Sequence, residues 1–404
     1  MNDFSYVEKL LDGVEVVWFP ISEVTERTTN IKWRETSERH QYIDLTSVSV
    51  DTKKIIETTE VKASNAPSRA QKLVKKDDVL FATTRPTQMR YCLIDEEYDG
   101  AVASTGYCVL RVKRDVTLPK WILHLISSSD FKKYLEENQS GSAYPAISDA
   151  KVKDFSIPIP CPDNPEKSLA IQAEIVRVLD AFTAMTAELT AELTAELNMR
   201  KKQYNYYRDQ LLSFEEGDVE WKTLGDLAEN LDSKRKPITS GLREAGEIPY
   251  YGASGIVDYV KDYIFDGDYL LVSEDGANLL ARNTPIAFSI SGKTWVNNHA
   301  HVLKFETYAE RKYVEYYLNS IDLTPYISGA AQPKLNKKNL ESINIPNPAP
   351  KEKERIVAIL DKFDSLTCSI KEGLPREIEL RQKQYEYYRD MLLSFPKSHS
   401  DKAA

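Results

Sequence analysis

Cysteine is scarce and scattered in this sequence. The four cysteines, Cys92, Cys108, Cys161 and Cys368, have no CxxC spacing, so neither a disulfide framework nor a cysteine zinc site is indicated. An apolar run of membrane-spanning length is missing too, and the opening MNDFSYVEKLL lacks a secretory pattern. We therefore expect a cytoplasmic protein without a membrane segment.

An excess of positive charge is likewise absent. The formal net charge of −9 argues against a free-standing, nonspecific nucleic-acid coat, which is normally basic. Basic residues still gather locally, between Lys53 and Arg90 and again at Lys234–Lys236. Such runs are either solvated surface or local faces for a nucleic acid, and the sequence leaves both interpretations open.

The motifs of methyl transfer and nucleotide binding are not found. An adenine methyltransferase needs a cofactor glycine loop and an Asn/Asp-Pro-Pro-aromatic tetrapeptide, and the sequence has neither. Ser291–Thr294 imitates the end of a phosphate-binding loop, but the first glycine of that loop would fall at Ala287. We therefore predict no catalytic residue in this chain.

Two further patterns are weak. His299 and His301 would share one face of a strand, yet no third metal ligand is evident, so we predict no metal site. Asp51, Glu60 and Lys62 imitate a nuclease spacing that chance often produces. Neither pattern predicts an activity.

What the sequence does contain is a long internal repeat. Arg200–Phe214 (RKKQYNYYRDQLLSF) returns 181 positions later as Arg381–Phe395 (RQKQYEYYRDMLLSF), with twelve identical residues. Ile175–Phe182 and Ile356–Phe363 match at the same offset. The segment between these blocks is equally long in both copies, which indicates a helical part that tolerates no insertion.

The repeat extends upstream at other offsets. The further matches pair Gly141–Pro145 with Gly329–Pro333, Ile157–Pro160 with Ile345–Pro348, and Trp18 with Trp221. The globular parts therefore vary in length while the helical parts do not. A period near 190 residues is too long for a solenoid and indicates duplicated domains.

Each globular part is expected to mix strands and a helix. The predicted strands are Gln41–Val48, Asp78–Thr83, Gly106–Val112 and Ile157–Pro160 in the first copy, and Ile264–Ser273, Ala287–Ser291, Ala300–Phe305 and Ile343–Pro346 in the second. The predicted helices are Trp121–Leu135 and Glu310–Asn319.

A much longer helix is predicted from Leu169 to Phe214. Its apolar residues recur at steps of three and four, and its length would be about 70 Å. A helix this long usually packs along a partner, and the second copy supplies one. Gly373–Pro375 should interrupt that second helix.

The long helix contains Thr-Ala-Glu-Leu three times, from Thr186 to Leu197. One interpretation is a good helix former with a leucine stripe. The other is a ruler, since four residues advance a helix by about 6 Å and turn it by about 400°. One such unit would therefore move an attached domain by roughly one or two base pairs of about 3.4 Å on nearly the same face.

These features resemble the specificity (S) subunits of type I restriction–modification enzymes, most closely the type IC subgroup. The resemblance covers nearly the whole chain and implies an α+β fold. Two α/β target-recognition domains would be separated by two long helices that form an antiparallel coiled-coil pair, in a pseudo-twofold circular arrangement. Tyr6–Leu11, which echoes Tyr207–Leu212, fits that circular arrangement. The implied domains are 1–160 and 215–350 for recognition, with helical spacers at 161–214 and 351–404.

The resemblance implies a noncatalytic subunit that binds double-stranded DNA. Each recognition domain would read one half of an asymmetric bipartite site with a fixed gap. Two methylation (M) subunits would bring S-adenosylmethionine, and two restriction (R) subunits would use ATP and Mg. The alternative is a coiled-coil assembly scaffold without sequence-specific DNA binding.

Three sets of residues are our candidates for these roles. Base contacts are predicted, from side-chain types that discriminate base edges, at Arg85, Gln88, Arg90, Ser254, Asn278 and Arg282. Phosphate contacts are predicted at Lys72, Lys75, Lys76, Lys234 and Lys236. Spacing and subunit docking are predicted at Thr186, Leu189, Leu193, Leu197, Tyr204, Tyr207, Tyr385 and Tyr388.

Overall fold

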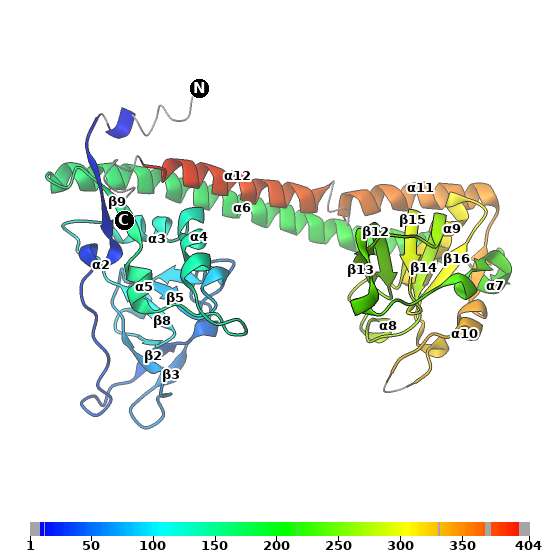
Figure 1. Cartoon of the computed structure of the whole chain (residues 1–404), viewed down its shortest axis with the longest axis horizontal. Helices are drawn as coiled ribbons and strands as arrows, with labels where there is room; N and C mark the ends of the chain where they lie inside the picture. Colours follow the sequence, from blue (N-terminus) through cyan, green and yellow to red (C-terminus); the bar gives the residue numbers. More distant parts are fainter. Residues whose placement is uncertain (1–8, 12, 216, 330–331, 368–372, 396–404) are drawn as a thin grey trace. The chain divides into compact units, whose positions relative to one another are not determined.

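The computed structural model describes residues 9–11, 13–215, 217–329, 332–367 and 373–395 (Figure 1). Contacts divide the chain into two compact units, Met1–Ala191 with Glu379–Ala404, and Glu192–Ile378. Each unit combines a globular head of strands and short helices with part of the long helices. The fold is therefore α+β, as expected. The first three residues of the Tyr6–Leu11 echo lie outside the described residues.

The N-terminal head is built from short strands. These are β1 Val16–Pro20, β2 His40–Ile43, β3 Thr59–Val61, β4 Ala70–Leu73, β5 Val79–Ala82, β6 Tyr91–Leu93, β7 Val102–Ser104, β8 Tyr107–Leu110 and β9 Ser156–Pro160. The α-helices are α2 Ile21–Val24, α3 Pro119–Leu125, α4 Ser129–Asn138 and α5 Asp149–Lys153, and the 3₁₀ turns are η1 Leu45–Ser47, η2 Pro86–Gln88 and η3 Glu96–Tyr98.

The strands of this head form a four-stranded sheet (β3-β2-β7-β4), a three-stranded sheet (β6-β5-β8) and the pair β1-β9. The residues of β5 and β8 are buried on both faces, which suits their continuous apolar sequences. Trp121 of α3 and Phe131 of α4 are fully buried in the core under β5. The core thus fixes the strand end from which the loop at Thr83 departs.

The C-terminal head has longer strands. These are β10 Glu220–Thr223, β11 Glu229–Asn230, β12 Ala245–Gly252, β13 Gly255–Val260, β14 Phe265–Ser273, β15 Ala287–Val296, β16 Ala300–Lys304 and β17 Asn344–Asn347. The α-helices are α7 Leu224–Leu227, α8 Asn278–Ala281, α9 Tyr308–Ser320 and α10 Lys337–Glu341, and the 3₁₀ turns are η4 Asp232–Lys234, η5 Ser240–Leu242 and η6 Thr324–Tyr326.

One six-stranded sheet dominates this head, in the order β11-β16-β14-β15-β12-β13, beside the pair β10-β17. Helix α9 packs on the sheet and also against the long helix α11 (Pro350–Thr367). Tyr313 and Leu318 of α9 are fully buried in this interface. The two heads therefore share an order of elements but differ in how their sheets are assembled.

The strand pair at the base of each head confirms the weak upstream repeat. In β1-β9 Trp18 lies opposite Pro158, and in β10-β17 Trp221 lies opposite Pro346. These residues were matched from the sequence at two different offsets. Their identical pairing means that the insertions between them lie within the heads and leave the base unchanged.

Helix α6 spans Pro165–Leu212, 48 residues, which corresponds to about 72 Å. Its start is defined by Pro165 at the first position and by Asn164, whose Oδ1 accepts from the Lys167 amide at 3.1 Å. Neither glycine nor proline follows before Leu212, and alanine, glutamate and leucine favour the helix. Its first part belongs to the N-terminal unit and its last part to the C-terminal unit.

Helix α6 pairs with α12 (Leu374–Leu392) in the first unit and with α11 in the second. The Phe182 and Tyr388 rings are 6.2 Å apart, and the Tyr207 and Phe363 rings are 5.7 Å apart. Phe182 and Phe363 are equivalent in the repeat, as are Tyr207 and Tyr388, so the two contacts exchange equivalent partners. This is the reciprocal, antiparallel pairing of an isologous interface.

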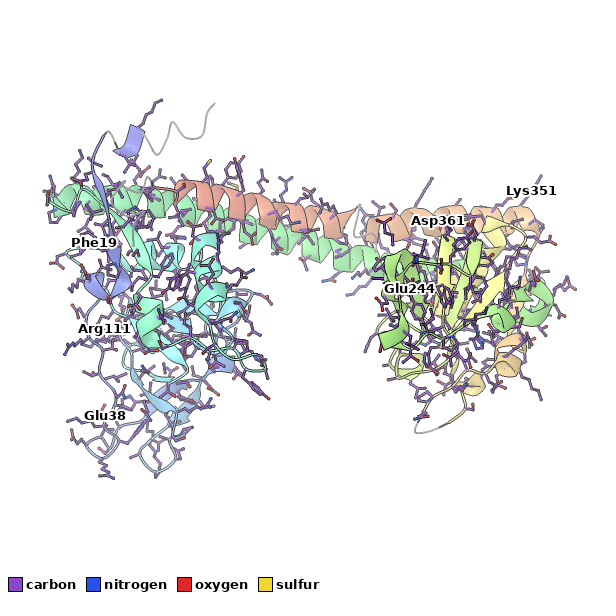
Figure 2. All side chains as sticks on the ribbon, viewed as in Figure 1. Phe19, Glu38, Arg111, Glu244, Lys351 and Asp361 are labelled. Atoms are coloured by element: carbon purple, nitrogen blue, oxygen red, sulfur yellow. The ribbon has the colours of Figure 1, made fainter. Side chains whose placement is uncertain are left out.

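Each head is fastened to its helix through equivalent positions. Asp180 accepts from Lys120 Nζ at 2.6 Å and lies 2.8 Å from His124 Nε2, and the bond with His124 contributes most to lowering the pKa of Asp180. The equivalent Asp361 (labelled in Figure 2) accepts from Tyr308 at 2.9 Å and from Tyr316 at 2.6 Å. A carboxylate is retained at the same place in both copies while its partners differ.

Two of the predicted elements differ from the structure, and the predicted helix interruption is confirmed. The strand predicted at Gln41–Val48 is wrong beyond Ile43, because Asp44 caps the 3₁₀ turn that follows. The single helix predicted at Trp121–Leu135 is two helices, since the Ser128 hydroxyl accepts from the Phe131 amide and begins a new one. The interruption near Gly373–Pro375 is confirmed, as α12 begins at Leu374.

In the described part of the chain, no helix combines the length and apolar character needed to cross a bilayer.

Candidate nucleic-acid interface

The same pair of loops projects from each head. In the first head, the loop after β5 is joined to Ser140–Ala146 by the bridge between Thr84 and Ala146. In the second, the loop after β14 is joined to Ser328–Lys334 by the bridge between Asp275 and Lys334. The predicted base contacts Arg85, Gln88, Asn278 and Arg282 all lie on the strand-end member of these pairs.

In the first head, Arg85 and Gln88 are exposed and Arg90 is half-buried. Arg90 Nη1 donates to the carbonyl oxygens of Val48 and, at 2.8 Å, Leu45. Its guanidinium therefore holds neighbouring loops together. Arg85 and Gln88 present side chains to solvent, as a base-reading role requires.

Lys53 fixes the far end of the same loop. Its ammonium donates to Met89 O at 2.5 Å and lies 4.7 Å from the centroid of the Tyr91 ring. Burial lowers the pKa of Lys53 to about 8. The loop from Thr83 to Arg90 is thus fixed at both ends.

In the second head, only Ser254 among the predicted base contacts is fully exposed, in the turn between β12 and β13. Asn278 closes its own loop, because its side chain donates to Thr284 O and accepts from Thr284 N, both at 3.0 Å. Arg282 is half-buried with a left-handed backbone, φ 50°, and burial lowers its pKa. The loop after β14 is therefore internally braced.

The predicted phosphate contacts are also divided. Lys72 pairs with Asp149 at 2.7 Å, and Lys76 pairs with Glu96. Lys75, Lys76, Lys234 and Lys236 are exposed. Two of the five ammonium groups therefore have a carboxylate partner within the head.

A network of charges missed by the sequence analysis underlies the second pair of loops. Arg235 Nη1 lies 2.6 Å from Glu274 Oε2, and Lys334 Nζ lies 3.0 Å from Glu274 Oε1. His301 places Nδ1 2.6 Å from Asp232 and Nε2 2.7 Å from the Leu335 carbonyl. The sequence signal was the KRK run at 234–236, which we interpreted as solvated surface or as a face for a nucleic acid and not as part of an internal charge network.

This network accounts for one of the two histidines, His301. Asp232, Glu274 and His301 lie close enough together to bind a metal ion. However, the guanidinium of Arg235 already contacts both carboxylates, 3.3 Å from Asp232 and 2.6 Å from Glu274. His299 takes a different partner, Asp275 at 2.9 Å. These residues fit a charge network that joins loops better than a metal site, because the Arg235 guanidinium already lies between the two carboxylates.

Burial alone would raise the pKa of Asp232 and Glu274. Hydrogen bonds and nearby charges together outweigh burial, led by the bond from His301 for Asp232 and by the bond from Arg235 for Glu274, so both pKa values lie below their usual range. A carboxylate with a lowered folded-state pKa stabilises the fold above its unfolded pKa. That contribution is lost as the pH falls through the folded value.

Glu274→Gln should therefore lower the free energy of unfolding of the C-terminal head by about 1–3 kcal/mol at neutral pH. The difference from wild type should shrink below pH of about 4, near the unfolded pKa of glutamate. Denaturant unfolding at both pH values measures it. The control is Glu244→Gln, whose exposed pair with Lys261 should contribute nothing measurable (Glu244 is labelled in Figure 2). An equal difference at both pH values would refute the assignment.

The residues predicted for spacing and docking follow the long helices. Thr186, Leu189, Leu193, Leu197, Tyr204 and Tyr207 lie on α6, and Tyr385 and Tyr388 lie on α12. The three leucines are half-buried. Arg208 lies 5.7 Å from the Tyr204 ring and its equivalent Arg389 lies 5.8 Å from the Tyr385 ring. The repeated block therefore folds alike in both places.

A tyrosine pair with at least one exposed ring accompanies each block. Tyr206 and Tyr207 meet edge to face at 5.4 Å, as do Tyr387 and Tyr388 at 5.4 Å. Tyr206 is 61% exposed and Tyr387 is 64% exposed. The chain thus presents the same aromatic surface twice.

The remaining weak patterns gain no chemistry from the structure. Ser291–Thr294 lies inside strand β15 and precedes no helix, unlike a phosphate-binding loop. Glu60 of β3 pairs with Arg39 at 2.7 Å.

Comparison with known proteins gives a family match over most of the chain. The type I restriction modification DNA specificity domain matches residues 14–199 and 216–380. The EcoR124I/EcoR124II specificity subunit of Escherichia coli is 41% identical over 426 residues, covering 98% of each chain. The EcoprrI specificity subunit of Escherichia coli is 36% identical over 385 residues, covering 92% of this chain and 93% of its own.

Solved structures agree at the level of the fold. A chain from a study of complex assembly and conformational transition of the type I R-M system has a TM-score of 0.70 at 21% identity, covering 94% of this chain and 97% of its own. The HsdS subunit from Thermoanaerobacter tengcongensis has a TM-score of 0.51 at 23% identity, covering 94% and 95%.

Proposed function

The chain belongs to the family of type I restriction-modification DNA specificity proteins, and on that premise we propose that it reads a bipartite, asymmetric double-stranded DNA site. One head would read each half-site, and the helical frame would fix the gap. The observation that carries this proposal is the reciprocal pairing of the long helices. The helix contacts are equivalent in the two units, whereas the heads attached to them differ. As a specificity subunit the chain is noncatalytic, and the chemistry belongs to other subunits of the complex.

The repeated aromatic surface supports two copies of one partner. We propose two methylation subunits, which bring S-adenosylmethionine and methylate adenine N6 in each half-site. Two restriction subunits would add ATP- and Mg-dependent cleavage, in the cytoplasm. Identical surfaces at equivalent positions favour this stoichiometry, because identical partners need equivalent sites.

The surroundings of the candidate DNA contacts separate two proposed roles. The exposed side chains of Arg85, Gln88 and Ser254 are proposed to meet base edges, and Lys75, Lys234 and Lys236 to meet phosphates. Arg90 and Asn278 already hold loops and Arg282 is half-buried, so these three are proposed to shape the reading surface. Lys72 and Lys76, which pair with carboxylates, are proposed to lie at its rim.

Reconstitution with the methylation subunits tests the function. The complex should select one bipartite sequence from random duplexes at a stated salt concentration, and methylation should mark that sequence. A reconstituted complex without sequence preference would favour the alternative, a coiled-coil assembly scaffold that does not read DNA.

The partner surface gives a separate prediction. Tyr206→Ala and Tyr387→Ala each remove an exposed ring from one copy of the surface. Each single variant is expected to lose one methylation subunit and the double variant both, as counted by native mass spectrometry. Tyr263→Ala, which removes an exposed tyrosine from a head, should retain two. Loss of both subunits from either single variant would contradict two equivalent sites.

A further inference from the structure

The loops Ser140–Ala146 and Ser328–Lys334 are closed in the same way at their ends, in the residues that the structure describes. The terminal residues of each loop exchange both backbone hydrogen bonds, at 2.9 and 2.8 Å in the first loop and at 2.8 Å twice in the second. Gly141 has φ +91° and Gly329 has φ +84°. A Cβ would meet the Tyr144 carbonyl oxygen at 2.9 Å or the Gln332 carbonyl oxygen at 2.4 Å, so both glycines are required.

Each closed loop is joined to the strand-end loop by equivalent bonds. The Arg85 amide donates to Pro145 O at 2.7 Å, and the Gly276 amide donates to Pro333 O at 3.3 Å. The amide of the residue that follows each loop forms a second hydrogen bond to the strand end. Ile147 donates to Thr83 O at 2.9 Å, and Leu335 donates to Glu274 O at 2.8 Å. The two heads thus join these loops to the strand-end loops in the same way.

The tips themselves differ. The sequence reads Gly-Ser-Ala-Tyr-Pro in the first loop and Gly-Ala-Ala-Gln-Pro in the second. Tyr144 is 75% exposed, and its equivalent Gln332 is also exposed. A tyrosine this exposed contributes little to a core. The shared backbone bonds suit contacts that both half-sites have in common. The difference between Tyr144 and Gln332 suits a contact with bases that differ between the half-sites.

Arg85 lies beside Tyr144, with Cζ 6.0 Å from the ring centroid. Arg85 has φ 48°, in the left-handed region, where its counterpart in the second head is Gly276 with φ +103°. A side chain there costs conformational energy that glycine avoids. Glycine would suit this backbone better, so an arginine here points to a role for its side chain.

We propose that the position shared by Tyr144 and Gln332 determines specificity in each head. The Tyr144 ring holds the Arg85 guanidinium in place for the O6 and N7 edge of a guanine, since arginine stacks on aromatic rings and reads guanine in this way. Gln332 contacts the N6 and N7 edge of an adenine in the other half-site. This proposal rests on the proposed function and adds two residues to it.

The test compares the wild-type chain with Tyr144→Ala, Tyr144→Phe and Gln332→Ala. Each is reconstituted with the methylation subunits and selected on duplexes with one half-site randomised at a time. Tyr144→Ala should reduce discrimination at one base pair of its half-site by roughly 5- to 150-fold and leave the other half-site unchanged. Tyr144→Phe should keep the preference, because the ring and not the hydroxyl holds Arg85. Gln332→Ala should relax only the opposite half-site.

Each variant carries its own folding control, since the half-site read by the other head must keep its wild-type preference. Equal weakening on every sequence, or unchanged discrimination in both alanine variants, would overturn this proposal while leaving the proposed function intact. A wild-type complex without sequence preference would instead overturn the proposed function.

Discussion

Removing one Thr-Ala-Glu-Leu unit, residues 190–193, is expected to shorten the preferred gap by about one or two base pairs and to leave both half-sites unchanged. The unit lies within the uninterrupted helix α6. Its loss withdraws about 6 Å of rise and a net rotation of about 40°. Methylation at the original site should fall on the order of 100-fold or more, because one head can no longer reach its bases. Methylation mapping of randomised-gap duplexes measures the new gap.

Two controls separate length from helix content. Glu192→Gln keeps the length and changes an exposed side chain, so the gap should be unchanged. Deleting only Thr190 and Ala191 rotates the following helix by about 200°, so recognition of a bipartite site should be lost at every gap. If the four-residue deletion altered the half-site bases themselves, α6 would not act as a ruler.

Trp121→Ala is expected to destabilise the N-terminal unit by about 3–5 kcal/mol, the usual cost of deleting a buried tryptophan. Trp121 is fully buried, donates from Nε1 to Pro158 O at 3.0 Å and meets the Phe395 ring at 5.7 Å. It therefore connects the base strand pair and the end of the last long helix to the core.

Calorimetry should resolve this effect, because each compact unit contributes its own transition. A loss of that size lowers the melting temperature of the N-terminal unit by roughly 6–20 °C. The matched control is Trp221→Ala, which removes a half-exposed tryptophan from the other unit and should cost about 1 kcal/mol. A shift of both transitions by the same amount would mean that the units unfold together.

The repeat made the architecture predictable because matched residues occupy matched places. Trp18 and Trp221 pair with equivalent prolines, and Phe182 and Phe363 meet equivalent tyrosines. Such agreement follows from duplication and needs no knowledge of packing. The two-helix split after Leu125 was not predicted, since serine hydroxyls that start a helix look like any polar interruption of an apolar pattern.

The candidate contacts were less predictable, because the residue types that read bases also bind backbone carbonyls. Arg90 and Asn278 are chemically suited to bases, yet their side chains hold loops. Only exposure distinguishes the two uses, and exposure depends on the whole head. Tyr144 was not a candidate, although the mismatch of Tyr144 with Gln332 inside a matched block was visible in the sequence.

The four-segment division of the chain remains a prediction. The compact units follow contacts instead, and they assign Ala191 and Glu192 of one continuous helix to different units. The reason is that each end of α6 packs on its own head, through Ile175 and Leu179 in one and Leu212 in the other.

The reciprocal contacts of the long helices also bear on how a target can change during evolution. Phe182 and Tyr207 both lie in the first copy of the repeat, which ends at Phe214, so a chain with that copy alone would carry both partners needed to pair with a copy of itself. In such a homodimer every mutation would appear twice, and the DNA sequence that the dimer recognises would stay palindromic. Covalent linkage of the two copies removes that constraint. A mutation in one head then changes one half-site only, so new recognition sequences can arise one half-site at a time.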